Sequence, residues 1–154
     1  MNDFAIYPFP FGFLQIGYED NKVIFLDKLD TAVNYGTKNK LTDTVYKEIT
    51  EYLEGNRKEF SFPYQLKGTE FQKKVWNELC RIPYGETRSY KDIAIAIGNP
   101  KAVRAVGMAN NRNPMMLVVP CHRVIGSNGK MVGYAGGISM KESLLALEKK
   151  IISQ

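Results

Sequence analysis

The sequence predicts two domains of different fold class, an α/β domain over residues 1–64 and a mainly helical domain over residues 65–154. Strand-like patterns dominate the first third of the chain, and short helical patterns dominate the rest. The charge changes sign as well: residues 1–66 hold 7 Lys and Arg against 10 Asp and Glu, whereas residues 67–154 hold 14 against 6. The two parts are therefore expected to have different roles.

The composition bounds the class of protein. The chain has 154 residues, of which 44% are hydrophobic and 24% charged, so it is neither fibrous nor wholly disordered. Its longest uncharged stretch, residues 4–18, is interrupted by prolines and glycines, and we expect neither a signal peptide nor a membrane span. With only two cysteines, a reduced, cytoplasmic protein is the expectation.

The N-terminal domain is expected to contain a hairpin and a helix. Residues 13–18 and 23–26 are apolar runs separated by a polar turn, which is typical of a β-hairpin. The periodicity predicts a helix over residues 41–54, with Thr42 or Asp43 as its N-cap. Residues 58–66 alternate aromatic and polar side chains, and predict an edge strand that leads into the linker.

A helix-turn-helix is the main feature expected next. A capping box from Thr69 to Gln72 opens a first helix, and Ser89 caps another over residues 90–97. Gly98 ends that helix, and Asn99-Pro100 is expected to start the following one, over residues 100–109. Two short helices joined by a tight turn favour DNA binding, although an ordinary helical hairpin has the same pattern.

The second of these helices has the composition of a DNA-contacting helix. Two cations and three small residues would let its backbone approach a nucleic-acid groove closely. These residues are Lys101, Ala102, Arg104, Ala105 and Gly107. The basic charge suits a phosphate backbone, but a solvated basic surface has the same charge.

The last third alternates short extended segments with one long helix. Residues 115–119 predict a buried strand, which places Cys121 and His122 at a strand end. Residues 124–134 predict a small hairpin. A capping box from Ser139 to Glu142 is expected to open the final helix. Its predicted apolar face consists of Leu144, Leu145, Leu147, Ile151 and Ile152.

Cys121 and His122 are the candidate reactive pair. A free thiol is about 3% ionised at pH 7, so a nucleophilic cysteine needs a base or a positive neighbour. The alternative is a buried cysteine and a hydrogen-bonded core histidine. Cys80, on an apolar helix face, is expected in the core. Two cysteines and one histidine cannot build a structural zinc site within the chain.

These residues occur in an order that resembles a known family. The run Val119-Pro120-Cys121-His122-Arg123-Val124-Ile125, with Asn113-Pro114 before it and Gly133-Tyr134-Ala135-Gly136-Gly137 after it, is similar to the active-site signature of O6-alkylguanine-DNA alkyltransferases. Further matches precede it in the same order, and the resemblance covers residues 66–150. It implies a ribonuclease-H-like N-terminal domain and a winged-helix-like C-terminal domain.

The resemblance implies a single-use DNA repair protein without a cofactor. Cys121 would be the nucleophile and alkyl acceptor, His122 would activate it through a bridging water, and Glu148 would orient His122. Tyr90 would assist departure of guanine. The expected partner is double-stranded DNA containing O6-alkylguanine, bound by a monomer.

The same resemblance assigns the remaining residues. Arg104 would fill the space of the flipped base, and the helix that carries it would lie in the minor groove. Asn113 would order the active-site segment. Val124, Tyr134 and Ala135 would border the base pocket, with Ala135 in place of a serine found in several relatives.

Two other functions remain open from the residues. A non-catalytic damage sensor would bind DNA with an affinity that alkylation of Cys121 leaves unchanged. A cysteine hydrolase would use Cys121 and His122 with turnover, which leaves the basic helix-turn-helix without a role. The zinc site that some relatives carry in the N-terminal domain is not expected, because the first 79 residues contain no cysteine or histidine.

Overall fold

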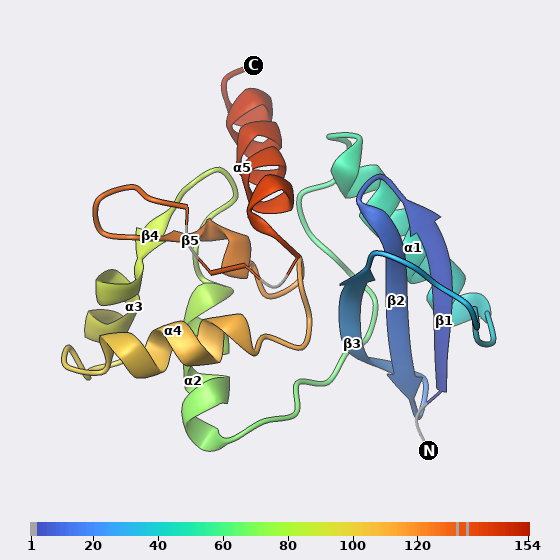
Figure 1. Ribbon diagram of the computed structural model, residues 1–154, viewed down its shortest axis with the longest axis horizontal. Coiled ribbons are helices and arrows are strands. Elements are labelled where there is room, and N and C mark those ends of the chain that lie inside the picture. Colours follow the sequence, from blue (N-terminus) through green and yellow to red (C-terminus); the bar gives the residue numbers. More distant parts are fainter. Residues whose placement is uncertain (1–2, 132, 135) are drawn as a thin grey trace. The chain divides into compact units, whose positions relative to one another are not determined.

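The computed structural model describes residues 3–131, 133–134 and 136–154. The chain divides into two compact units, Met1–Lys67 and Gly68–Gln154, each with its own elements (Figure 1). Among the described residues, no helix is long and apolar enough to cross a membrane.

The N-terminal unit has a three-stranded antiparallel sheet in the order β1-β2-β3. The strands are β1 (Asp3–Phe9), β2 (Gly12–Glu19) and β3 (Lys22–Leu29). The predicted hairpin is β2–β3, and its turn residues Asp20 and Asn21 both have positive φ, which matches the right-handed twist of the strands. Strand β1 was not predicted, because Pro8 interrupts its pattern; the proline is tolerated near the end of this outer strand.

Helix α1 (Lys40–Leu53) packs on the sheet against β1 and β2. Val45, Ile49 and Tyr52 are buried on its inner face, as the periodicity predicts. The predicted N-cap is wrong: Asn39 is the cap, and Thr42 is its partner three residues on in a capping box. Asn caps as well as Thr or Asp do, so the sequence offered competing starts one turn apart.

The predicted edge strand over residues 58–66 is also wrong. This segment joins β3 only through a parallel bridge between Val23 and Tyr64. The amide of Val23 donates to the Pro63 carbonyl, and the amide of Gln65 donates to the Val23 carbonyl. Pro63 has no backbone N–H to donate, so the hydrogen bonds between this segment and β3 do not continue into a regular strand pair.

The described residues of the C-terminal unit form four α-helices, a turn of 3-10 helix and one short parallel strand pair. The helices are α2 (Glu70–Leu79), α3 (Tyr90–Ala96), α4 (Val103–Asn111) and α5 (Ile138–Ile152). Buried Trp76 of α2 joins two of them, since its indole N–H donates to the Ala109 carbonyl at 2.8 Å. The predicted capping box at Thr69 and the predicted N-cap at Ser89 are both confirmed.

Two predicted helix starts in this unit are wrong. Helix α4 begins at Val103, because the amide of Ala102 donates to the Asn99 carbonyl and closes a turn instead. Helix α5 begins at Ile138 after Gly137, whose φ of +96° favours glycine, so Ser139 does not cap it. In both cases a backbone turn sets the start of the helix, and no side chain caps it.

The apolar face predicted for α5 is only partly correct. Leu144 is buried, but Ile152 is 48% exposed. The buried stripe instead includes Lys141 and Glu148.

The prediction that Cys80 lies in the core is wrong. Cys80 is exposed at the C-terminal end of α2.

The segment around the candidate cysteine has no regular strand before it. Residues 115–119 are mostly buried but form a turn, with Leu117 at a φ of 73° and the Val119 amide bonded to the Met115 carbonyl. The predicted hairpin over 124–134 is replaced by a parallel pairing of β4 (Arg88–Ser89) with β5 (Val124–Ile125). This pairing connects the start of α3 with the segment that follows Cys121.

Candidate active site

Cys121 begins a single turn of 3-10 helix that ends at Arg123. The Arg123 amide donates to the Pro120 carbonyl at 2.9 Å, and the Val124 amide donates to the Cys121 carbonyl. In an extended strand consecutive side chains point to opposite faces, but in this turn His122 and Arg123 both reach the same carboxylate. The turn thus directs the side chains of His122 and Arg123 to Glu148, while Cys121 contacts Asn113.

The thiol of Cys121 is buried and held by Asn113. The side-chain amide of Asn113 donates to Cys121 Sγ at 3.1 Å and to the Val119 carbonyl at 2.8 Å. Its oxygen accepts from the Met115 amide at 2.9 Å. One side chain therefore fixes the turn before the cysteine and points a donor at the sulfur.

Burial raises the pKa of the Cys121 thiol to about 11, while the Asn113 hydrogen bond and the charge of Lys141 act in the opposite direction. The resting cysteine is therefore a neutral thiol near pH 7. A thiolate forms there only if a nearby base takes the proton.

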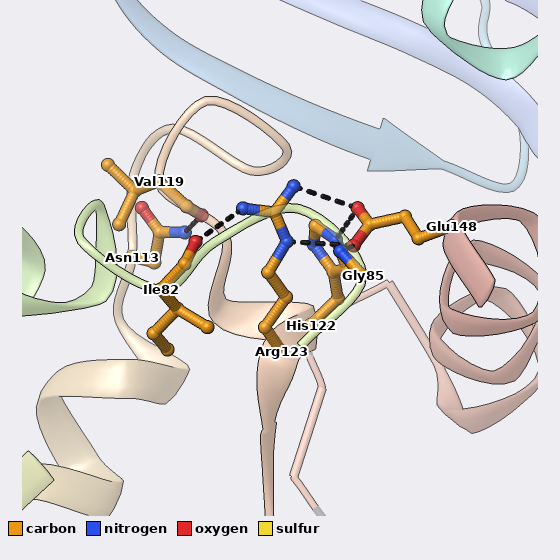
Figure 2. A network of polar contacts seen from close by, with 7 residues as sticks. All are labelled: Ile82, Gly85, Asn113, Val119, His122, Arg123 and Glu148. Atoms are coloured by element: carbon orange, nitrogen blue, oxygen red, sulfur yellow. Dashed lines mark hydrogen bonds and ion pairs between the residues drawn. The ribbon is translucent and has the colours of Figure 1, made fainter. Parts of the chain in front are cut away.

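Glu148 is the centre of a buried polar network (Figure 2). Its carboxylate accepts from His122 Nε2 at 2.8 Å and from the Gly85 amide at 2.9 Å. Arg123 adds a two-point contact, Nε and Nη2 each donating at 2.9 Å, and its Nη1 donates to the Ile82 carbonyl. The carboxylate is held by donors on two separate segments, the turn at residues 121–123 and the loop at Gly85, so its position is fixed.

The state of His122 follows from this network. Burial lowers the pKa of the ring, although the hydrogen bond to Glu148 and its charge oppose that effect, so the imidazole is neutral near pH 7. A carboxylate only accepts, so Nε2 carries the ring proton and Nδ1 carries the lone pair. His122 can therefore accept a proton at Nδ1 while Glu148 stabilises the resulting positive charge.

Two phenols lie within electrostatic reach of the thiol. Burial and the charge of Cys121 raise the pKa of both Tyr90 and Tyr134. Tyr90 opens α3 with its ring over Gly107 of α4, where a Cβ would lie 3.9 Å from the ring. A Cβ on Gly133 would lie 3.2 Å from the Tyr90 hydroxyl oxygen, so the absence of a side chain there leaves this hydroxyl accessible. Ala135 lies outside the described residues.

The candidate DNA-contacting residues lie on and just before α4, away from its buried side. Val106, Ala109 and Asn110 face the core, whereas Lys101 and Arg104 are exposed. Ala105 is exposed as well, and Ala102 and Gly107 are half-buried. Neither Lys101 nor Arg104 forms an ion pair within the described part of the chain.

Sequence reasoning missed three contributors to this site. The first is Lys141, whose buried ammonium donates to the Val124 carbonyl. The other two are the Gly85 amide and the Arg123 guanidinium, which both donate to the Glu148 carboxylate. The sequence could have indicated that Lys141 and Glu148 are buried, because each lies at helical spacing from Leu144 on the inner face of α5. Nothing local to the sequence indicates the Gly85 contact, which joins segments 63 residues apart.

Comparison with known proteins shows the family. Residues 4–66 match the 6-O-methylguanine DNA methyltransferase ribonuclease-like domain, and residues 70–150 match the DNA-binding domain of the same family. The chain belongs to the 6-O-methylguanine DNA methyltransferase family. Each of its two units thus has a counterpart there.

Relatives and solved structures agree with this membership. The chain is 44% identical to a methylated-DNA--protein-cysteine methyltransferase of Methanosarcina acetivorans, over 94% of this chain and 97% of that one. It is 59% identical to an inducible one of Bacillus subtilis, but over 70% of this chain and only 60% of the relative's length. The structure of Mycobacterium tuberculosis OGT in complex with DNA matches with a TM-score of 0.88 at 41% identity, covering 96% of this chain and 93% of that one.

Among the described residues, no group of three or more His, Cys, Asp or Glu side chains could hold a metal ion. The site itself brings together a buried thiol, a neutral imidazole and a fixed carboxylate. Such a set can move a proton from sulfur and can make a nucleophile for one transfer.

Proposed function

We propose that the protein repairs DNA by transferring an alkyl group from O6-alkylguanine in a duplex to Cys121, once per molecule. The observation that carries this proposal is a buried Cys121 that is followed directly by His122, whose ring is hydrogen-bonded to Glu148, in a chain of this family. The relatives are named for transfer of a methyl group from DNA to a protein cysteine. The protein would act as a monomer.

In the proposed step, the Cys121 proton passes to His122 Nδ1 through a bridging water, and the sulfur attacks the alkyl carbon. The carbon–O6 bond breaks as the carbon–sulfur bond forms, and guanine leaves with its electron pair and takes up the proton of the Tyr90 hydroxyl. The proton held on His122 then returns to the Tyr90 oxygen through water. Glu148 stabilises the imidazolium in between. The product thioether has no leaving group that water could displace readily, so the protein is used once.

The remaining site residues would position the base. Tyr90 would donate its hydroxyl proton toward the departing guanine, since its pKa is raised and the neutral phenol is a donor. Asn113 would hold Sγ in line with the alkyl carbon. Val124 and Tyr134 would border the base pocket, together with Ala135.

The exposed side of α4 would bind the duplex in the minor groove. Its cations suit phosphate, and its small residues allow close approach. Arg104 would occupy the stack in place of the flipped base, which offsets part of the few kcal/mol that unstacking costs. The DNA complex of the Mycobacterium tuberculosis relative supports DNA as the partner.

A stoichiometry experiment tests the proposed function against its rivals. Duplex DNA carrying O6-methylguanine is mixed with the protein at equimolar amounts and in tenfold excess of DNA, and the remaining lesion is counted. We expect repair to stop at one lesion per protein molecule. Continued repair in excess DNA would indicate a turnover enzyme, and tight binding with no loss of the lesion would indicate a sensor.

Arg104→Ala should slow repair in duplex DNA by about tenfold or more, because the space of the flipped base is no longer filled. The free base O6-benzylguanine requires no flipping, so its reaction with Cys121 should be unchanged. Single-turnover rates on both substrates measure the difference, and Arg81→Ala, which removes another exposed arginine of the same unit, is the control. An equal loss of rate on both substrates would contradict the role of Arg104 in base flipping.

A further inference from the structure

Asn110 of α4 has a buried side-chain amide without a hydrogen-bond partner. The residue is 1% exposed, and neither its amide nitrogen nor its amide oxygen is hydrogen-bonded within the described part of the chain. Such a group is destabilising, because it has lost its hydrogen bonds to water and has gained none in the protein. An apolar side chain of similar size would avoid this cost, so the amide points to a role toward a bound ligand.

Helical spacing places Asn110 between two groups of the candidate active site. Side chains three residues apart on a helix are neighbours, with Cβ atoms about 5–6 Å apart. One turn before Asn110 is Gly107, over which the ring of Tyr90 lies. One turn after it is Asn113, whose side chain donates to Cys121 Sγ and whose backbone N–H donates to the Asn110 carbonyl at 3.3 Å. The amide of Asn110 therefore lies between the Tyr90 ring and the thiol, where the alkylated base is proposed to bind.

A second buried polar group near the thiol also has no hydrogen-bond partner. It is the hydroxyl of Tyr134, a residue close enough to the thiol for the charge of Cys121 to raise its pKa. Buried polar groups in native proteins are nearly always hydrogen-bonded, so two exceptions near one reactive sulfur indicate a pocket whose polar atoms bind a ligand.

The amide of an asparagine presents a donor, Nδ2, beside an acceptor, Oδ1. O6-alkylguanine presents the complementary pair. Guanine carries a proton on N1, but alkylation of O6 removes it, so N1 becomes an acceptor beside the 2-amino donor. N1 is also next to the carbon that bears O6, so this edge lies near the thiol when the alkyl carbon faces Cys121.

We propose that Asn110 is a specificity-determining residue of the base pocket: Nδ2 donates to N1 of the flipped O6-alkylguanine, and Oδ1 accepts from its 2-amino group. This inference rests on the proposed function and adds to it the group that distinguishes the damaged base. Undamaged guanine would bring its N1 proton against the Nδ2 donor, so the two bonds could not form together. No covalent bond forms or breaks at Asn110.

Asn110→Leu tests the proposal, since leucine has a similar size but neither a donor nor an acceptor. Single-turnover transfer is measured from a duplex carrying O6-methylguanine and from the same duplex carrying O6-methylhypoxanthine, which lacks the 2-amino group. We expect the parent to react about tenfold faster with O6-methylguanine, the scale of one hydrogen bond. Asn110→Leu should lose tenfold or more on O6-methylguanine and should react with the two bases within twofold of each other. Asn77→Leu, an exposed asparagine of α2, is the matched control and should keep the preference of the parent.

Thermal unfolding separates a contact to the base from a role in the fold. Asn110→Leu should unfold at the same temperature as the parent or higher, because its amide has no partner to lose. A lower unfolding temperature, or a variant that does not fold, would overturn the proposal, as would a preference for the 2-amino group that is absent from the parent or persists in Asn110→Leu. A parent that transfers no methyl group from either base would overturn the proposed function as well, which distinguishes the two failures.

Discussion

Cys121→Ala is expected to abolish alkyl transfer completely while leaving the binding of alkylated duplex DNA within about threefold of the parent. The sulfur is the atom that accepts the alkyl group, and no neighbouring group can replace it. The proposed DNA-contacting residues of α4 are unchanged in this variant. Labelled methyl transfer measures the first effect, and an electrophoretic or fluorescence titration measures the second.

Cys80→Ala is the matched control for this prediction, because Cys80 is the other cysteine of the chain. It should retain full transfer. The surrounding protein atoms partly desolvate the Cys80 thiol and raise its pKa, although the residue is exposed. Its sulfur donates weakly to the Val118 carbonyl at 4.0 Å, whereas the Cys121 sulfur accepts from the Asn113 amide. Methyl transfer to Cys80 in the Cys121→Ala protein would refute the assignment of the acceptor.

Glu148→Ala is expected to have the largest effect on stability and a large effect on rate. The carboxylate is fully buried and accepts from His122, Arg123 and the Gly85 amide. Its removal leaves a buried guanidinium without its counter-charge, which costs about 3–5 kcal/mol in comparable cases. The unit of which it is part should unfold at a much lower temperature, as calorimetry would show.

Glu148→Gln separates the chemical role of the carboxylate from its role in the fold. The amide keeps the volume but cannot stabilise the imidazolium, so transfer should slow by roughly 10²-fold, the usual scale for impaired acid–base catalysis. Glu142→Gln, an exposed glutamate of the same helix, should behave as the parent. A transfer rate within twofold of the parent in a folded Glu148→Gln protein would remove Glu148 from the mechanism.

Local signals predicted much of the fold. The hairpin β2–β3, helix α1, the capping box of α2 and the N-cap of α3 each depend on residues close together in the chain, and the structure confirms them. Two of the failures share one cause. The starts of α4 and α5 are set by backbone turns at Ala102 and Gly137, where a sequence offers several equivalent capping residues.

The candidate site also has parts that the sequence predicts and parts that depend on the fold. The motif around Cys121 and His122 is contiguous, so the sequence could show it, and the resemblance placed Glu148 behind His122. Lys141 and the Gly85 amide reach the site from distant segments, and only the fold brings them there. The sequence offered one indication for Lys141, a charged residue at a position where helical spacing predicts burial. The other apolar residues of α5 suggested a different inner face, so the position of Lys141 was not recognised.

The central claim is that one alkyl group moves from guanine to Cys121 and stays there. The most direct test is the intact mass of the protein after incubation with duplex DNA carrying one O6-methylguanine, followed by peptide mapping. We predict a mass increase of one methyl group, located on Cys121 and saturating at one per molecule. An unchanged mass after tight binding and loss of the lesion, or a methyl group on any other residue, would contradict the account.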